Sequence, residues 1–274
     1  MTEQQVALVT GASSGIGKAI AEQLLKDGLI VYVAARRVAK MQDLAQLGAH
    51  VLAMDVTDDE QMVSGINQIN AAHGGGDVLV NNAGYAIYGA VEDTPIDDAR
   101  RQFEVNIFGL ARLTQLVLPH MRARRAGKII NISSIGGKIY TPLGAWYHAT
   151  KHALEGWSDA LRLELQQFNI AVVIVEPGII KTEFGDVMTA PLLQRSGKGA
   201  YAQMAQNVAK RTQESYEGKL GSSPSVIADV VSKAVKAKRP KTRYVAGALA
   251  KPLLLVRRIL PDKWYDKMIL SQAT

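Results

Sequence analysis

Short apolar runs that alternate with stretches of helical periodicity most constrain how this chain can fold. Each run has the character of a buried strand, and apolar residues recur at helical spacing between the runs. Strands that alternate with helices predict an α/β fold, a doubly wound parallel sheet with helices on both faces. The predicted strands are Val6–Thr10, Ile30–Ala34, His50–Met54, Asp77–Val80, Lys128–Ile132, Ile170–Val175 and Arg243–Ala246.

The turn after the first predicted strand is rich in glycine and opens a predicted helix. Glycine lets the backbone approach a pyrophosphate closely, and the helix N-terminus offers free N–H groups and the positive end of its dipole. Many loops contain such glycines, but the strand before this turn and the helix after it favour nucleotide binding. The predicted contacts are Gly11, Ser13, Ser14, Gly15, Ile16 and Gly17.

The residues after the second predicted strand indicate which nucleotide binds. A carboxylate there would bind the ribose 2′-hydroxyl of NAD, but this chain has Ala35 followed by Arg36 and Arg37. Paired guanidinium groups suit a 2′-phosphate, and Lys18 adds positive charge nearby. The alternative is that both arginines merely begin a solvated helix. The missing acid and the gained cations together favour NADP(H).

Other predicted strand ends carry small or polar residues that would face the same ligand. Asp55, with Val56 beside it, could bind an adenine amino group or could cap the helix that begins near Asp58. Small residues after the fourth strand would let the backbone pass close to a cofactor ribose, or would form an ordinary turn. Ligands of such sheets bind beyond the carboxyl ends of the strands, so one shared site is predicted. Its further members are Asn82, Ala83, Gly84, Pro177 and Gly178.

The catalytic hypothesis depends on Ser134, Tyr147 and Lys151. Tyr147 and Lys151 are four residues apart, which places them on one face of a helix. An ammonium beside a phenol should lower the pKa of the phenol, and such a tyrosine can transfer a proton near neutral pH. Ser134 follows a buried strand, where its hydroxyl can hold a carbonyl oxygen. Many surface helices carry a Tyr and a Lys at this spacing, so the pair supports a catalytic role only together with the predicted nucleotide-binding turn upstream.

With these residues in hand, the chain resembles the classical short-chain dehydrogenases/reductases from about Val6 to Ala246. The resemblance implies a Rossmann fold and a catalytic tetrad of Asn106, Ser134, Tyr147 and Lys151, in which Asn106 orders a water next to Lys151. The motifs that carry the resemblance are Thr10–Gly17, Asn81–Gly84, Asn106, Ser134, Tyr147–Lys151 and Pro177–Thr182.

The same resemblance implies further details of the site and the reaction. Thr182 would contact the nicotinamide carboxamide, and Ile180 and Lys151 would also bind the cofactor, as would Tyr147. The implied activity is NADPH-dependent reduction of a carbonyl compound. Oxidation of an alcohol is the alternative direction, and a non-catalytic NADP-binding sensor would be expected to lose the Tyr or the Lys. Glu176 and the C-terminal extension look like the branch containing 17β-hydroxysteroid, retinol and long-chain aldehyde enzymes.

The substrate class is indicated only by apolar and aromatic residues near the catalytic ones. They suit a hydrophobic carbonyl or alcohol substrate, although such residues are more often plain packing. No cluster of His, Asp and Glu has the spacing of metal ligands, so no metal site is predicted. The candidate lining residues are Ile87, Tyr88, Ile139, Tyr140, Leu143, Trp146 and Phe184.

The C-terminal end differs from the rest of the chain in charge. Residues 233–274 contain eleven Lys and Arg but only two Asp, whereas residues 1–232 contain 21 basic and 23 acidic residues. We predict a catalytic domain over 1–247, with a mobile cover over the site at 183–223, and a basic amphipathic extension over 248–274. The extension would pack on the body and close the pocket, or would rest on an anionic membrane. We favour packing, because Pro252 and Pro261 break a short apolar run.

Several expectations concern the environment and partners of the chain. It has no cysteine, no signal-peptide pattern and no apolar run near the roughly 18 residues of a membrane-spanning helix, so we predict a cytoplasmic protein. The basic tail contains no nucleic-acid-binding motif, so no nucleic acid partner is expected. Long apolar stripes over 96–122 and 147–167, helices that the family usually pairs between subunits, predict a homodimer or homotetramer.

Overall fold

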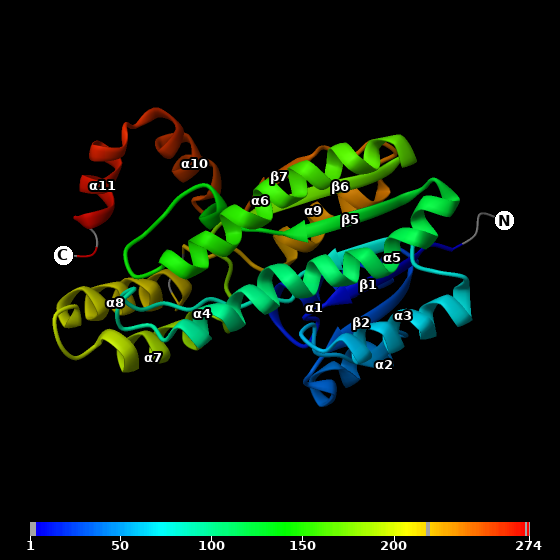
Figure 1. The fold of residues 1–274 in the computed structure, drawn as a ribbon, viewed down its shortest axis with the longest axis horizontal. Helices are drawn as coiled ribbons and strands as arrows, with labels where there is room; N and C mark the ends of the chain where they lie inside the picture. Colours follow the sequence, from blue (N-terminus) through cyan, green and yellow to red (C-terminus); the bar gives the residue numbers. More distant parts are fainter. Residues whose placement is uncertain (1–3, 218–219, 272, 274) are drawn as a thin grey trace.

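The computed structural model describes residues 4–217, 220–271 and 273. In this part of the chain seven parallel strands form one sheet with the order β3-β2-β1-β4-β5-β6-β7 (Figure 1). All seven predicted strands are confirmed, with ends shifted by two residues at most. The strands are β1 Val6–Thr10, β2 Ile30–Ala35, β3 His50–Ala53, β4 Val78–Asn81, β5 Gly127–Ile132, β6 Ile170–Pro177 and β7 Arg243–Ala246.

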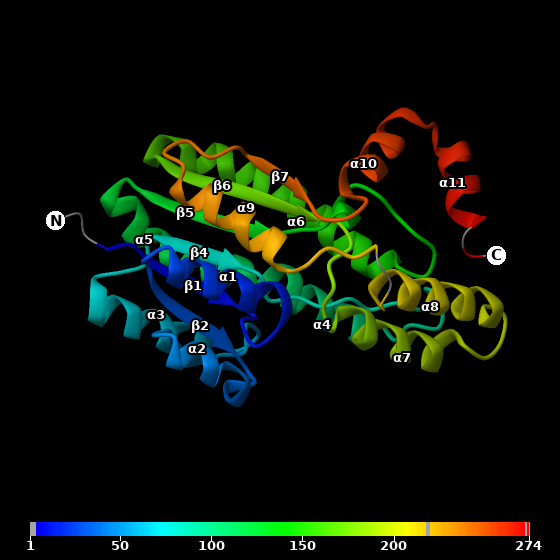
Figure 2. The ribbon, with the colours of Figure 1, turned by 180° about the vertical axis from the view of Figure 1, so that it is seen from behind.

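Helices cover both faces of the sheet, as the alternating pattern predicts. Helices α1 and α9 pack on one face, and α3, α5 and α6 pack on the other (Figures 1 and 2). The helices are α1 Gly15–Lys26, α2 Gln42–Gln46, α3 Asp59–His73, α4 Ile96–Phe103, α5 Leu110–Arg124, α6 Ala145–Leu165, α7 Phe184–Ser196, α8 Ala202–Glu217, α9 Ser225–Lys236, α10 Ala250–Ile259 and α11 Asp262–Leu270.

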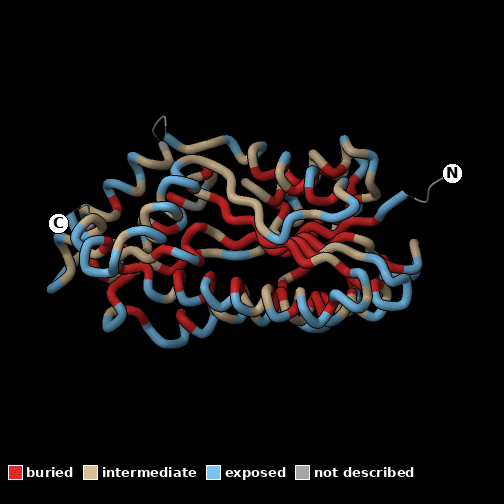
Figure 3. Tube along the Cα trace, turned by 90° about the horizontal axis from the view of Figure 1, so that it is seen from above, coloured by how far each residue is buried: buried red, intermediate tan, exposed pale blue. Residues whose placement is uncertain are grey.

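Side chains alternate between the two faces along each strand and fill two cores. In β1, Val9 packs with α1 and α9, whereas Leu8 packs with α3, α5 and α6. Figure 3 shows the result, buried strands between helices whose outer turns are exposed. Because both faces are buried, each strand reads as a continuous apolar run instead of an alternating one.

The segment predicted as one long helix over 96–122 is interrupted. Helix α4 passes into a π-helix at Glu104–Gly109, from which α5 continues. A π-helix widens the turn and often occurs at functional sites. Asn106 lies in this segment and is buried. Gly109 is needed there, because a Cβ at this position would collide with the backbone oxygen of Val56.

The segment 183–223 contains two helices, α7 and α8, which the sequence pattern did not predict. They pack on each other and enclose a small core formed by Leu192, Ala205 and Ala209 with Ala90 and Leu143 of the body. Gly185 and Pro191 lie inside α7, and the helical periodicity of α7 is weak. The role of this segment as a cover over the site stays a prediction.

Candidate active site

The carboxyl ends of β1 and β4 are locked together at the glycine-rich turn. The side-chain amide of Asn82 donates to the backbone oxygens of Thr10 and Gly11, at 2.9 and 3.3 Å. The Thr10 hydroxyl accepts in turn from the backbone N–H groups of Asn82 and Ala83, both at 3.0 Å. A Cβ at Gly11 would lie 2.9 Å from the Cα of Ala83, and one at Gly17 would meet the Asn82 amide. These glycines therefore allow the two turns to touch, which an ordinary turn would not require.

The glycine-rich turn leaves a helix N-terminus facing the strand ends. Gly11 and Gly15 have φ angles of 66° and 56°, in the left-handed region that favours glycine. Helix α1 begins at Gly15, so its first N–H groups have no partner within the helix and are free to bind phosphate oxygens. The side chain of Thr182 lies beside Gly15, because a Cβ there would be 3.1 Å from its methyl carbon. The residues present fit a dinucleotide whose pyrophosphate sits on α1.

Arg37 lies over the same turn. Its guanidinium donates to the hydroxyls of Ser13 and Ser14, at 3.2 and 3.0 Å. Glu183, at the start of α7, pairs with Arg37 at 3.5 Å and with Lys40 at 3.4 Å. These pairs are half-exposed, so each contributes at most about 1 kcal/mol. Glu183 was missed by the sequence analysis, because it lies 146 positions after Arg37 and no local pattern joins the two residues.

Asp55 lies after the neighbouring strand, and the structure shows that it does not cap a helix. Asp58 is the residue that caps α3, since its carboxylate accepts from the backbone N–H of Gln61 at 3.1 Å. The Asp55 carboxylate binds Thr57 instead, accepting from the backbone N–H at 3.0 Å and from the hydroxyl at 2.8 Å. Arg36 lies 3.8 Å from Asp55 and is largely exposed. Asp55 is therefore a neighbour of Arg36 and does not cap the helix, and its contact with an adenine stays a prediction.

At the end of β6 the predicted cofactor residues also have structural roles. Gly178 permits a close approach of the chain at Ala248, whose backbone oxygen would collide with a Cβ at Gly178. Ile180 is buried in the core beneath α1 and α9, and Val56 is buried in the opposite core. Their predicted contacts with the cofactor stay predictions.

Ser134 and Tyr147 are brought together by a turn that presses on α6. Ser134 lies two residues after the end of β5 and caps a 3₁₀ turn over Ile135–Gly137, where its hydroxyl accepts from the backbone N–H of Gly136 at 3.0 Å. A Cβ at Gly136 would be 3.1 Å from the ring of Tyr147, and one at Gly137 would be 2.9 Å from the backbone oxygen of Lys151. This close packing brings the hydroxyl of Ser134 beside the phenol of Tyr147.

Lys151 and Asn106 are buried beside this pair. The ammonium of Lys151 donates to the backbone oxygen of Ile132 at 2.9 Å. The amide of Asn106 donates to the backbone oxygen of Tyr85 at 2.9 Å and to the hydroxyl of Thr150 at 3.1 Å. Asn106 thereby ties the π-helix to the residue that precedes Lys151. Its implied role in ordering a water stays a prediction.

The pKa of Tyr147 is raised, whereas the sequence predicted that it would be lowered. Burial raises the pKa of Tyr147, and the hydrogen bond with Ser134 offsets only part of this effect. Burial also lowers the pKa of Lys151 to about 8, against the opposing charge of Glu155. The prediction that Lys151 lowers the pKa of Tyr147 is therefore wrong for this structure, because burial of the phenol favours its neutral form. Tyr147 is a neutral phenol near pH 7, the form that donates a proton.

Only some of the candidate lining residues lie near Tyr147. The ring of Tyr88 is 6.0 Å from that of Tyr147, and Tyr88 packs with Leu143. Tyr216 of α8 is close enough for its hydroxyl to contribute to the raised pKa of Tyr147, and the sequence analysis missed it. Ile87 is buried, and the side chain of Phe184 lies outside the described residues.

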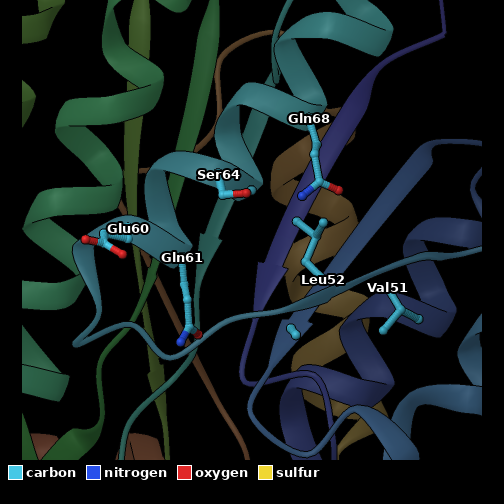
Figure 4. A pocket seen from close by; sticks show the side chains of 8 residues that line it. Val51, Leu52, Glu60, Gln61, Ser64 and Gln68 are labelled. Carbon is cyan, nitrogen blue, oxygen red and sulfur yellow. The ribbon is translucent and has the colours of Figure 1, made fainter.

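Three other candidate lining residues face elsewhere. Ile139 and Tyr140 pack against the C-terminal extension, and Trp146 lines a groove of about 230 Å³ with residues of α4 and the π-helix. A larger pocket, of about 360 Å³, lies beside the edge strand β3 and α3 (Figure 4). None of the predicted site residues lines it, so it carries none of the proposed chemistry. Among the described residues no group of His, Cys, Asp and Glu could hold a metal ion.

Comparisons with known proteins agree with the fold and indicate the family. Residues 5–191 match the family model for short chain dehydrogenase. A probable short-chain type dehydrogenase/reductase, VdlC of Helicobacter pylori, is 37% identical over 96% of each chain. The 3-ketodihydrosphingosine reductase of Bacteroides thetaiotaomicron is 36% identical, over 95% of this chain and 94% of that protein. An NADPH-dependent 3-dehydrocapnine reductase of Ornithobacterium rhinotracheale is also 36% identical, over 96% and 95%.

Solved structures support the same assignment. A short-chain dehydrogenase from Streptomyces avermitilis has a TM-score of 0.82 and 35% identity, and the match covers 98% of this chain and 96% of that one. A serine dehydrogenase complexed with NADP+ has a TM-score of 0.78, with 26% identity over 89% and 95% of the chains. The fold and site define an oxidoreductase. The chain belongs to the short-chain dehydrogenase family, whereas the narrower steroid and retinol branch is not established by these relatives.

Proposed function

We propose that this chain is an NADPH-dependent reductase of a hydrophobic ketone or aldehyde. The observation that carries the proposal is the juxtaposition of Ser134 and Tyr147, next to buried Lys151 and at the same sheet edge as the glycine-rich turn. NADPH, held by the glycine turn and Arg37, would supply the hydride that reaches the carbonyl carbon. Ser134 would hold the carbonyl oxygen, and Tyr147 would transfer its phenolic proton to that oxygen, which leaves an alcohol and NADP+.

The direction and substrate class follow from the surroundings of Tyr147. Its raised pKa keeps it protonated, which suits an acid in a reduction better than a base in an alcohol oxidation. Tyr88, Leu143 and Tyr216 give the neighbourhood an apolar, aromatic character. Two relatives are named as reductases of keto compounds, 3-ketodihydrosphingosine and 3-dehydrocapnine. A non-catalytic sensor would have no need of the Ser134–Tyr147 pair. A cytoplasmic location stays a prediction.

The proposal is tested by following NADPH oxidation with a panel of ketones and aldehydes of increasing alkyl-chain length. We expect turnover with apolar substrates, higher for longer chains than for short ketones. Turnover in the presence of NADP+ and alcohols alone, with none on any carbonyl compound, would contradict the direction. Absence of turnover in both directions, with NADPH bound, would favour the sensor.

Cofactor preference provides a prediction about Arg36 and Arg37. Replacing both by Gln should weaken NADPH binding by about tenfold or more, because each removes a charge-assisted hydrogen bond to the 2′-phosphate. NADH binding should change little, and dissociation constants from fluorescence titration measure both. Lys26→Gln, which removes an exposed charge from the other end of α1, is the matched control. Equal affinities of the unaltered protein for NADH and NADPH would refute the preference.

Lys151 provides a prediction about pH. Its pKa of about 8 means that its charge is present below pH 8 and disappears above it, so kcat/KM for NADPH in the reductive direction should fall as the pH rises through about 8. In Lys151→Arg the charge persists, and whatever activity remains should not fall at this pH. The measurement is kcat/KM between pH 6 and 10. If kcat/KM of the Lys151→Arg variant falls at the same pH as that of the unaltered protein, a group other than Lys151 titrates.

Exposed apolar side chains on the outer helices support a homodimer or homotetramer. Ile96 of α4, Phe108 of the π-helix and Leu163 of α6 are 52%, 55% and 68% exposed. Burying them between subunits would remove apolar surface from water. Light scattering at micromolar concentration should give at least twice the 29.6 kDa of the chain, and Leu163→Lys should reduce it. A mass of one chain for the unaltered protein would rule out the prediction.

A further inference from the structure

The C-terminal extension is fixed to the body by its inner face. Tyr265 of α11 is completely buried against Ile135 and Ile139, in the turn that follows Ser134. Its hydroxyl donates to the backbone oxygen of Tyr140 at 3.2 Å, and the Tyr140 hydroxyl donates to Asp266 at 2.9 Å. The packing predicted for the extension is therefore present in the structure. It places α10 and α11 at the end of the molecule that also carries α7 and α8 (Figures 1 and 2).

The outward face of the extension has a different character. On α10 the exposed residues Leu255 and Ile259 are one helical turn apart, and on α11 Trp264 and Leu270 are exposed. Their exposed fractions are 58%, 67%, 65% and 43%. Such large apolar side chains on adjacent short helices form a patch that water solvates poorly.

Basic residues lie between these apolar ones. Lys251 and Arg258 are exposed on α10, and Lys263 and Lys267 are exposed on α11. Within the described part of the chain none of these four has an ion-pair partner. The two carboxylates of the extension face other groups, since Asp262 pairs with Arg257 at 2.9 Å and Asp266 binds Tyr140. The outward face is thus both apolar and strongly positive.

We propose that this outward face, called the foot, rests on an anionic lipid surface. Leu255, Ile259 and Trp264 would enter the boundary between headgroups and acyl chains, while the four cations would meet anionic headgroups. Indole favours this boundary, because it has an apolar body and a polar N–H. Among the described residues no helix is long and apolar enough to cross a membrane, so the contact is peripheral.

Charge complementarity selects lipid over a second copy of the chain. In a symmetric contact between two feet, the same patch of each would meet the other, and four cations would face four cations. An anionic surface instead neutralises all of them. The extension that carries the foot packs on the turn after Ser134, and the side chain of Asn207 in α8 donates to the backbone oxygen of Ala273 at 3.2 Å. If the proposed function is correct, contact with lipid would therefore hold the active site near a hydrophobic substrate dissolved in that lipid.

The test is cosedimentation of the full chain with vesicles of phosphatidylcholine and phosphatidylglycerol in a 3:1 ratio. We expect binding at low salt that weakens at higher salt, and little binding to phosphatidylcholine alone. The foot variant replaces Lys251, Arg258, Lys263 and Lys267 with Gln. Since each cation near the surface strengthens binding about fivefold, this variant should lose measurable binding. The matched control replaces four exposed cations outside the foot with Gln and should bind the vesicles as the unaltered protein does. These cations are Lys26, Lys233, Lys238 and Arg239.

A second measurement examines the apolar half of the foot. Brominated lipids should quench the fluorescence of the vesicle-bound protein, and Trp264→Phe should remove most of that quenching. NADPH affinity should be the same in all variants, which shows that they are folded. No cosedimentation at low salt, equal loss in foot and control variants, or a foot variant whose mass halves in light scattering would each overturn the proposal. None of these outcomes depends on reductase activity, so a failure of the membrane proposal can be told apart from a failure of the proposed function.

Discussion

Tyr147→Phe is expected to lower kcat/KM for ketone reduction by about 10²–10⁴-fold, the usual contribution of a positioned acid. The substitution removes one oxygen from a buried ring whose packing against Tyr88 stays in place. The hydride donor and the Ser134 hydroxyl remain, but the developing alkoxide has no proton donor at the distance of a hydrogen bond. NADPH affinity and the unfolding transition should change little, since the substitution removes a single oxygen and leaves the buried ring in place.

Tyr32→Phe is the matched control for this variant. It removes the hydroxyl of another buried tyrosine, which hydrogen-bonds His73 at 3.1 Å on the opposite side of β1 from the site. Steady-state rates with a good ketone substrate and fluorescence titration with NADPH make the comparison. If Tyr147→Phe turns over at the parent rate, or if Tyr32→Phe loses as much activity, Tyr147 is not the proton donor.

Arg243→Met is expected to destabilise the fold by about 3–5 kcal/mol, the cost of leaving buried charges without their partner. Arg243 begins β7 and pairs with Glu155 at 3.0 Å, Asp159 at 2.6 Å and Glu176 at 3.3 Å. Glu155 and Glu176 are nearly completely buried. One guanidinium thus joins β7 to α6, the helix that carries Tyr147. Lys138, which pairs with Glu155 at 3.2 Å, is retained in the variant, so we expect a loss in the lower part of this range.

The pH dependence of that loss distinguishes an electrostatic from a packing effect. Burial, followed by the nearby charge of Glu155, raises the pKa of Glu176 from 4.5 to about 7. A carboxyl whose pKa is higher in the folded state binds its proton more tightly there, so the stability it contributes is lost as the pH rises from about 4.5 through 7. Without Arg243 this pKa rises further, and the deficit should be smaller at pH 5 than at pH 8.

Urea unfolding of both proteins at the two pH values measures the effect. Arg100→Met, which breaks an exposed pair with Asp97, is the control and should cost less than about 1 kcal/mol. A deficit in Arg243→Met that is independent of pH would mean that lost packing, and not the buried carboxylates, is responsible.

The sequence by itself determined the strands and their alternation with helices over most of the chain, and it indicated which residues to propose for the site. Strands buried on both faces must be continuous apolar runs, so their pattern is visible without any tertiary information. The glycine-rich turn is equally local, since close backbone approach demands glycine wherever the rest of the chain lies. Because parallel strands end at one edge of the sheet, Gly11, Asn82, Ser134 and Pro177 could be assigned to one side of the molecule.

Only the tertiary structure decided how these groups interact. The ionic contacts of Glu183 and Arg243 join residues far apart in the chain. Helix α7 has weak periodicity of its own and packs on α8. The pKa of Tyr147 is the sharpest case. A four-residue spacing from Lys151 predicts attraction between the two groups, but the loss of water around both is a property of the folded surroundings, and here burial of the phenol favours its neutral form.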